Sequence, residues 1–223
     1  MSELIARFTT LPPYGLGGLV ILLLYGLQSE IRFGARARTM RAGASDRWST
    51  LAVSFSAAVA VLGFVCGIKA HSTEAAAWLP HWFRRAIIPG LPGIAWCGVA
   101  IAGLGLCLRL WAVLTLRERY TRTLLVQDEH SVERSGPYGW IRHPGYLGSL
   151  LCLNGVALAS GNLVALSASL LVTFLAYGYR IKVEDEMLVE SLGSTYADYR
   201  HEIGALFPFR RSTTASRHSR PVE

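Results

Sequence analysis

The sequence is poor in charged residues. Only 17% of its 223 residues are Asp, Glu, Lys or Arg and 52% are hydrophobic, whereas a typical soluble domain carries about 25% charged residues. This composition argues against an ordinary soluble domain and predicts an all-α integral membrane protein. At this length we expect one domain, residues 1–209, followed by a basic tail, residues 210–223, whose low apolar content predicts disorder.

Several chemical signatures are absent as well. The four cysteines lie within apolar runs and lack the spacing of metal ligands, so we expect buried thiols and no metal site. No glycine-rich phosphate loop and no Ser-His-Asp elbow stands out, and the N-terminus does not have the pattern of a signal peptide. The net charge of +7 is concentrated between the apolar runs and in the tail. It therefore predicts contact with lipid headgroups and not with nucleic acid.

Long apolar segments predict about five transmembrane helices, because about 20 apolar residues cross a bilayer. These segments are residues 14–31, 49–68, 87–116, 146–159 and 163–179. The third contains two Pro-Gly pairs near its start, so its helix is expected to begin near Gly93. The last two are separated by Ser160-Gly161-Asn162, a turn signal, and are therefore expected to form a helical hairpin.

The chain becomes charged after residue 179. From Arg180 onward, apolar residues recur at helical spacing and predict a C-terminal amphipathic helix on the membrane surface or capping the bundle: Val183, Met187, Leu188, Leu192 and Tyr196. The arginines between residues 32 and 47 form the strongest positive cluster and predict a cytosolic loop. With five spans, the segments after the third helix and after the hairpin then share the cytosolic mouth of the bundle.

The segment GPYGWIRHPGYLG, residues 136–148, joins a polar run to an apolar one. Its prolines predict non-helical backbone, which at a membrane boundary is normally buried in protein or lines a cavity. An interfacial loop with Arg142 extended towards lipid headgroups is the plainer interpretation. A ligand site is favoured because that interpretation does not explain the His143-Pro144 pair. Arg109, within the third apolar run, is equally consistent with contact to headgroups and with a role in the site.

The hairpin brings two polar sets together, since each flanks one of its arms. Arg142 and His143 are expected near Arg180, Glu184 and Asp185. Carboxylates suit hydroxyl, ammonium or sulfonium groups, and arginine binds a carboxylate through two parallel hydrogen bonds. The residues alone therefore predict a pocket for a polar ligand at the cytosolic mouth, without naming the ligand.

Three segments, in this order and spacing, resemble the isoprenylcysteine carboxyl methyltransferase family. They are HSVERSGPYGWIRHPGYLG (residues 130–148), RIKVEDEMLVESLGSTYADYR (180–200) and LFPF (206–209). The resemblance covers the region 130–209 and implies S-adenosylmethionine as the methyl donor. It also implies a lipophilic acceptor that enters from the bilayer, most of all the carboxylate of a prenylated cysteine. The protein would then act in the plasma or inner membrane or the endoplasmic reticulum, with its active site facing the cytosol.

The resemblance also implies roles for individual residues. Catalytic roles fall to Arg180, which would orient the acceptor or the cofactor carboxylate, and to Glu184, which would hold the cofactor. Asp185 stands where the family has a second glutamate, and Gly204 where it often has a proline. Cofactor contacts are implied for His130, Val132, Tyr138, Arg142, His143, Pro144, Tyr146, Leu147, Glu184 and Asp185.

Three other functions stay open. Membrane sterol and lipid reductases that use NADPH have a similar Arg-His-Pro turn, but the acidic pair after Arg180 and the Gly-Pro-Tyr entry favour the methyltransferase. A phospholipid amine N-methyltransferase would need a base, a role open to Glu184 or His143. A non-catalytic lipid-binding protein is the third, and fold resemblance alone does not exclude it. The oligomeric state is left open.

Overall fold

A computed structural model describes residues 13–33, 46–71, 77–90, 92–116 and 132–208. Within these ranges the chain is helical, as predicted, and the one extended contact is an isolated bridge between Ile87 and Asn162. The elements are α2 (Pro13–Phe33), α3 (Ser49–Lys69), α4 (His81–Arg85), α5 (Gly93–Leu116), the 3-10 turn η4 (Gly136–Gly139), α6 (Pro144–Ala159), α7 (Leu163–Leu192) and α8 (Ser194–Glu202).

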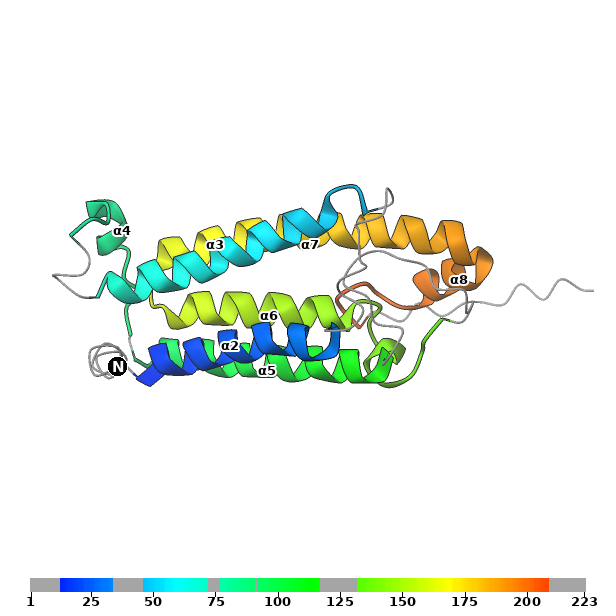
Figure 1. Cartoon of the computed structure of the whole chain (residues 1–223), viewed down its shortest axis with the longest axis horizontal. Coiled ribbons are helices and arrows are strands. Elements are labelled where there is room, and N and C mark those ends of the chain that lie inside the picture. The colour runs from blue at the N-terminus through cyan, green and yellow to red at the C-terminus, as the bar shows by residue number, and fades with distance from the viewer. Residues whose placement is uncertain (1–12, 34–45, 72–76, 91, 117–131, 209–223) are drawn as a thin grey trace, which may run out of the picture.

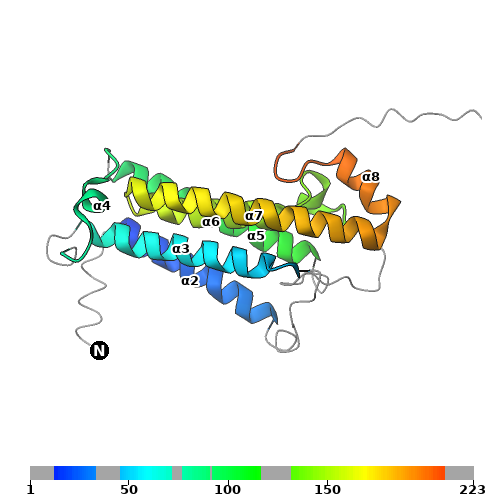
Figure 2. The ribbon, with the colours of Figure 1, turned by 90° about the horizontal axis from the view of Figure 1, so that it is seen from above.

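Five of these helices lie side by side in an elongated bundle: α2, α3, α5, α6 and α7 (Figures 1 and 2). The short helix α4 and the turn between α6 and α7 lie at one end, and η4 and α8 lie at the other (Figure 1). Because α7 runs back along α6, the two predicted site segments meet at the η4 and α8 end.

Three helices are long and apolar enough to cross a membrane, namely α3, α5 and α7. The described apolar part of α2, Gly15–Gln28, and the whole of α6 are shorter than a full crossing. The prediction of a helical membrane protein is thus confirmed in outline. The count of five complete spans stays a prediction.

Helices α5 and α6 cross at backbone contact. A Cβ added at Gly105 would lie 2.5 Å from the Cys152 nitrogen, and one added at Gly155 would lie 2.7 Å from the Gly98 oxygen. In lipid, helices associate through close packing of small residues rather than through hydrophobic burial. These glycines therefore fix the distance between α5 and α6, and with it the position of the residues just before α6.

The predicted hairpin is present. Asn162 ends the turn after α6, and its side-chain oxygen accepts a hydrogen bond from the Ala165 nitrogen at 3.0 Å, which caps α7. Further along, Asn154 of α6 donates to Thr173 at 3.0 Å and accepts from Ser169 at 2.9 Å. These polar contacts join the two arms within the apolar part of the bundle.

The predicted start of a separate amphipathic helix at Arg180 is wrong. Helix α7 continues without interruption through Gly178 and Arg180 to Leu192, because no proline interrupts it and Gly178 keeps a helical backbone. The break comes at Gly193, which has a φ of 59° that favours glycine, and α8 follows. The site residues of this segment consequently stand on a rigid extension of a bundle helix.

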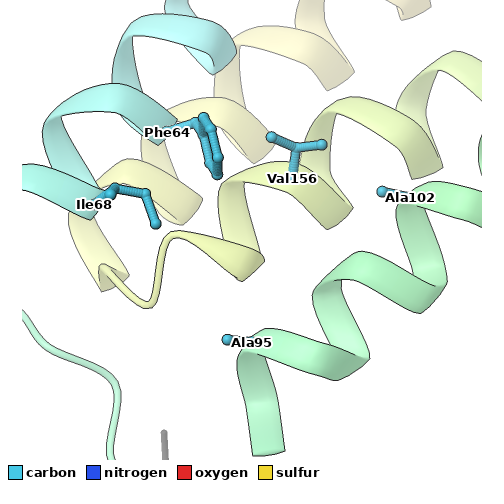
Figure 3. Close-up of a cluster of buried hydrophobic side chains, with 5 residues drawn as sticks. All are labelled: Phe64, Ile68, Ala95, Ala102 and Val156. Atoms are coloured by element: carbon cyan, nitrogen blue, oxygen red, sulfur yellow. The ribbon is translucent and has the colours of Figure 1, made fainter. Parts of the chain in front are cut away.

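The core lies where α3, α5 and α6 converge. Phe64 and Ile68 of α3 pack with Ala95 and Ala102 of α5 and with Val156 of α6 (Figure 3). The expectation of buried thiols holds for two cysteines, Cys66 and Cys152, but not for the other two: Cys97 and Cys107 are exposed on α5. An apolar run in a membrane protein has a lipid-facing side, so apolar surroundings in the sequence do not imply burial.

Candidate active site

The turn before α6 is held by contacts from both directions. Gly136, with a φ of 54°, lies against α5, where an added Cβ would be 3.0 Å from the Thr115 hydroxyl. On the opposite side, the Arg142 nitrogen donates to Gly204 O at 2.9 Å and the His143 nitrogen donates to Ala205 O at 3.0 Å. The chain after α8 thus fixes the backbone of the Arg-His-Pro turn.

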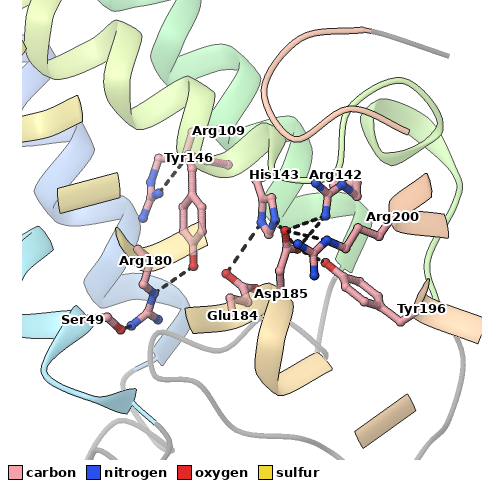
Figure 4. A network of polar contacts seen from close by, with 11 residues as sticks. Ser49, Arg109, Arg142, His143, Tyr146, Arg180, Glu184, Asp185, Tyr196 and Arg200 are labelled. Atoms are coloured by element: carbon pink, nitrogen blue, oxygen red, sulfur yellow. Dashed lines mark hydrogen bonds and ion pairs between the residues drawn. The ribbon is translucent and has the colours of Figure 1, made fainter. Parts of the chain in front are cut away.

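Asp185 is the centre of a buried polar network (Figure 4). Both of its carboxylate oxygens lie 2.7 Å from Arg142 Nη1, and Oδ1 also lies 3.1 Å from His143 Nε2. The Tyr196 hydroxyl donates to the same oxygen at 2.5 Å, and Arg200 Nε lies 3.8 Å from the other. Asp185 therefore ties α7 to α8 and to the turn, and both its oxygens are engaged.

Two tyrosines of α8 complete this side of the site. Burial raises the pKa of Tyr199 to about 12, and burial together with the nearby Asp185 charge raises the pKa of Tyr196 as well. Both phenols are therefore protonated at neutral pH and act as donors. The Tyr199 hydroxyl donates to Tyr138 O at 2.7 Å and so holds η4 against α8.

Glu184 presents a buried oxygen to the space beside His143. Its Oε2 lies 3.7 Å from His143 Nδ1, and no residue in the described part of the chain donates a hydrogen bond to it. The His143 ring stacks on Tyr146, with ring centroids 5.4 Å apart and an angle of 4° between the planes. A carboxylate oxygen beside a flat pair of rings can accept a hydrogen bond, or face a cation, from a ligand.

Arg180 is 4% exposed and directed towards the start of α3. Its Nη1 lies 2.7 Å from Asp46 Oδ1 and 2.8 Å from the hydroxyls of Ser49 and Thr50, and its Nε donates to the Tyr146 hydroxyl at 3.0 Å. Burial raises the pKa of Asp46, but hydrogen bonds from Thr50 and Ser49 and the Arg180 charge together lower it below its ordinary value. Arg180 and Asp46 thus form a buried ion pair.

Three partners of Arg180, namely Asp46, Ser49 and Thr50, were not predicted from the sequence. They lie about 130 residues away along the chain, and no local pattern links the start of the second apolar run to the end of the last. The single available signal was Asp46 itself, an acidic residue at the end of an arginine-rich loop.

Arg109 points into the bundle and not towards its surface. Its Nη1 donates to the Ser149 hydroxyl at 2.6 Å and to Gly145 O at 3.3 Å, and its guanidinium lies 4.9 Å from the centre of the Tyr25 ring. Figure 4 places it beside Tyr146. Of the two interpretations of Arg109, the geometry favours a role next to the site.

The remaining predicted residues lie around this centre. Pro144 is the first residue of α6, and the Leu147 nitrogen donates to His143 O at 3.1 Å. Val132 packs against the cluster of Tyr196, Tyr199 and Ile203, and buried Tyr138 belongs to η4. His130 lies outside the described residues. Which of these side chains contact a cofactor stays a prediction.

Comparisons with known proteins agree with this geometry. The sequence model of the isoprenylcysteine carboxyl methyltransferase (ICMT) family matches residues 98–190. The chain is 28% identical over 137 residues to a protein-S-isoprenylcysteine O-methyltransferase of Tribolium castaneum, covering 59% of this chain and 49% of that protein. It is 29% identical over 119 residues to the Saccharomyces cerevisiae protein of the same name, covering 47% of this chain and 50% of the relative.

The fold is shared as well. The solved structure of the eukaryotic intramembrane Ras methyltransferase ICMT matches with a TM-score of 0.61 and 21% identity, over 90% of this chain and 70% of that one. The chain spans about half the length of the first curated relatives that it matches. Family model, relatives and fold all agree with the resemblance drawn from the sequence, and residues 98–190 match the model of the isoprenylcysteine carboxyl methyltransferase family.

Proposed function

We propose that this protein transfers a methyl group from S-adenosylmethionine to a lipophilic acceptor, the carboxylate of a prenylated cysteine. The observation that carries the proposal is the buried Oε2 of Glu184, which lies beside His143 and receives no hydrogen bond within the described part of the chain. A buried polar atom without a partner costs about 1–3 kcal/mol, more when it is charged, so a ligand group that satisfies it binds favourably.

The residues present fit the proposed cofactor. S-adenosylmethionine offers hydroxyl and ammonium groups that suit the Glu184 carboxylate, and His143 and Tyr146 present a stacked pair of flat rings beside it. When bound, it supplies an electrophilic methyl group on a sulfonium. Asp185 supports the site indirectly, because its oxygens are already engaged by Arg142, His143 and Tyr196.

The chemistry asks little of the protein beyond positioning. The acceptor carboxylate is ionised at neutral pH, so no side chain has to remove a proton before it attacks. Holding two reactants in line can contribute about 7–11 kcal/mol in favourable intramolecular reactions. Exclusion of water from the site would have a secondary part, because the acceptor carboxylate and the donor's sulfonium would carry opposite charges that already attract each other before the transfer.

Two arginines, each already held by contacts within the bundle, lie near the acceptor's expected path. Arg180 faces Tyr146 from α7, and Arg109 lies beside the same tyrosine from α5 (Figure 4). Guanidinium groups orient carboxylates. An acceptor that leaves the bilayer between the helices would meet these groups before it reaches Glu184 and His143. The arginines between residues 32 and 47 support a cytosolic location for this end of the bundle.

The test is calorimetric titration of the detergent-purified protein with S-adenosylhomocysteine, in parallel with NADPH. We expect saturable binding of S-adenosylhomocysteine that is lost in His143→Ala and Glu184→Ala. The matched control is Glu190→Gln, which neutralises an exposed carboxylate on the same helix and should bind as the wild type does. Uptake of NADPH alone would assign the protein to the reductases. Equal binding by all variants would show that Glu184 does not contribute to binding of the cofactor.

A further inference from the structure

The start of α3 is an unusual turn that delivers one carboxylate into the site. Asp46 is 2% exposed, and its oxygens accept hydrogen bonds from the Ser49 hydroxyl at 3.0 Å and from the Thr50 hydroxyl at 2.7 Å. The Thr50 nitrogen adds a third at 3.2 Å, so the side chain also caps the helix. The carboxylate is thus fixed before it meets Arg180.

The backbone of this turn is strained. Arg47 has a φ of 44° and Trp48 a φ of 65°, and both are non-glycine residues in the left-handed region. Such conformations are unfavourable for residues with a side chain and persist where the surroundings enforce them. Here α7 enforces them, because the Tyr179 hydroxyl donates to Arg47 O at 2.8 Å and Glu186 pairs with the Arg47 guanidinium at 2.6 Å. The turn is docked on α7 on both sides of Arg180.

Arg180 and Glu184 are four residues apart on one helix, a spacing at which opposite charges commonly pair. The structure has a different arrangement. Arg180 pairs with Asp46 at 2.7 Å, and no direct ion pair in the described part of the chain joins it to Glu184. The Tyr146 hydroxyl lies between them: it accepts a hydrogen bond from Arg180 and donates one to Glu184. Buried ion pairs contribute little net stability, so the Asp46–Arg180 pair is better explained by what it positions.

We propose that Asp46 is a positioning residue: it keeps the Arg180 guanidinium from pairing directly with Glu184 and so keeps Glu184 Oε2 available to the ligand. This inference rests on the proposed function for the identity of the ligand. The Asp46–Arg180 pair also orients the stacked rings of the site. Arg180 donates a hydrogen bond to the Tyr146 hydroxyl, and the Tyr146 ring stacks on His143. One carboxylate at the start of α3 would thereby set three groups of the site.

The inference can be tested without any ligand, by thermal unfolding of four proteins: wild type, Asp46→Asn, Glu184→Gln and the double variant. Asparagine keeps an oxygen that can cap α3 but removes the charge. In the wild type, Glu184→Gln replaces a carboxylate that makes no direct ion pair with Arg180 and whose buried Oε2 has no donor in the described part of the chain, so it should leave Tm unchanged or raise it. In the Asp46→Asn protein, Arg180 turns to Glu184, and the same change should lower Tm by about 2–4 °C. An equal effect of Glu184→Gln in both backgrounds overturns the inference.

Binding gives an independent readout. Asp46→Asn should weaken S-adenosylhomocysteine binding about tenfold, as loss of one hydrogen bond to a charged group would. It should have no further effect in the Glu184→Gln background, whereas damage to the turn alone would weaken binding equally in both. Glu186→Gln removes the exposed ion pair of the same turn and should leave affinity unchanged. Absence of binding by the wild type itself would contradict the proposed function. The role of Asp46 would then be decided by the unfolding test, which needs no ligand.

If Asp46→Asn does not fold, a milder variant replaces it. The Thr50 hydroxyl donates to Asp46 and lies 2.8 Å from Arg180, and Thr50→Val removes it while keeping the side chain's shape. This variant should shift the effect of Glu184→Gln on Tm in the same direction by a smaller amount. No shift would overturn the inference.

Discussion

At the scale of single residues, Asp185 and Glu184 are adjacent carboxylates with opposite surroundings. Asp185 is buried between Arg142, His143 and Tyr196, whereas Glu184 Oε2 has no donor in the described part of the chain. Removing one charge of a buried pair costs about 3–5 kcal/mol because its partner is left uncompensated. We therefore expect Asp185→Asn to lower the free energy of unfolding by about 3 kcal/mol or more, measured by chemical denaturation.

The control for this prediction is Arg200→Ala. Its guanidinium is 3.8 Å from Asp185 but 49% exposed, so its loss should change stability by less than about 1 kcal/mol. A wild-type denaturation curve for Asp185→Asn would show that the network around Asp185 does not support α8 and the turn.

The sequence predicted some of these residues and missed others for a physical reason. His143 and Glu184 stand in motifs whose residue types suit a polar ligand, so they could be named from the sequence. Two features could not be named from it: that Glu184 Oε2 has no donor in the described part of the chain, and that Asp185 is fully engaged. Both depend on Tyr196 and on the direction of Arg180 in space. Asp46 had no motif around it at all.

At the scale of elements, the contact between α5 and α6 decides where the site begins. A Cβ at Gly105 would lie 2.5 Å from the Cys152 nitrogen and 2.6 Å from Gly148 O, both backbone atoms that cannot move aside. We expect Gly105→Ala to destabilise the protein by about 1–3 kcal/mol, measured as loss of Tm in detergent. Gly103→Ala, on the same helix with no atom within 4 Å of the added Cβ, should be neutral or slightly stabilising. Equal effects of both would refute this role of Gly105.

The extents of most helices followed from apolar length and turn signals. The third helix starts at Gly93 as expected from its Pro-Gly pairs, and the hairpin turns at Ser160-Gly161-Asn162. The error came at Arg180, where a change from apolar to charged residues was interpreted as a helix boundary. The polarity of a helical segment shows whether it faces lipid or water, but it does not end the helix. Helix α7 ends where the backbone leaves the helical conformation, at Gly193.

At the scale of the whole molecule, the site exists only because the bundle closes. Its groups come from the start of α3, from the turn before α6 and from the end of α7, and α8 covers them (Figure 4). Each of these lies at the same end of the bundle (Figure 1). Alternating helix direction, which the sequence predicted, gathers these segments, whereas the pairing among them is a property of the folded chain.

The orientation of this end in the membrane can be tested directly. A methyl donor made in the cytosol requires the site there, and the arginine-rich loop before α3 predicts the same placement. In a variant whose four native cysteines are replaced, Trp140→Cys marks the site end and Trp82→Cys the opposite end, since both tryptophans are exposed. In intact cells or right-side-out vesicles, an impermeant maleimide should label Trp82→Cys at once. It should label Trp140→Cys only after the membrane is permeabilised. The reverse pattern would contradict the predicted orientation, because the site would then lie on the side of the membrane opposite the cytosol.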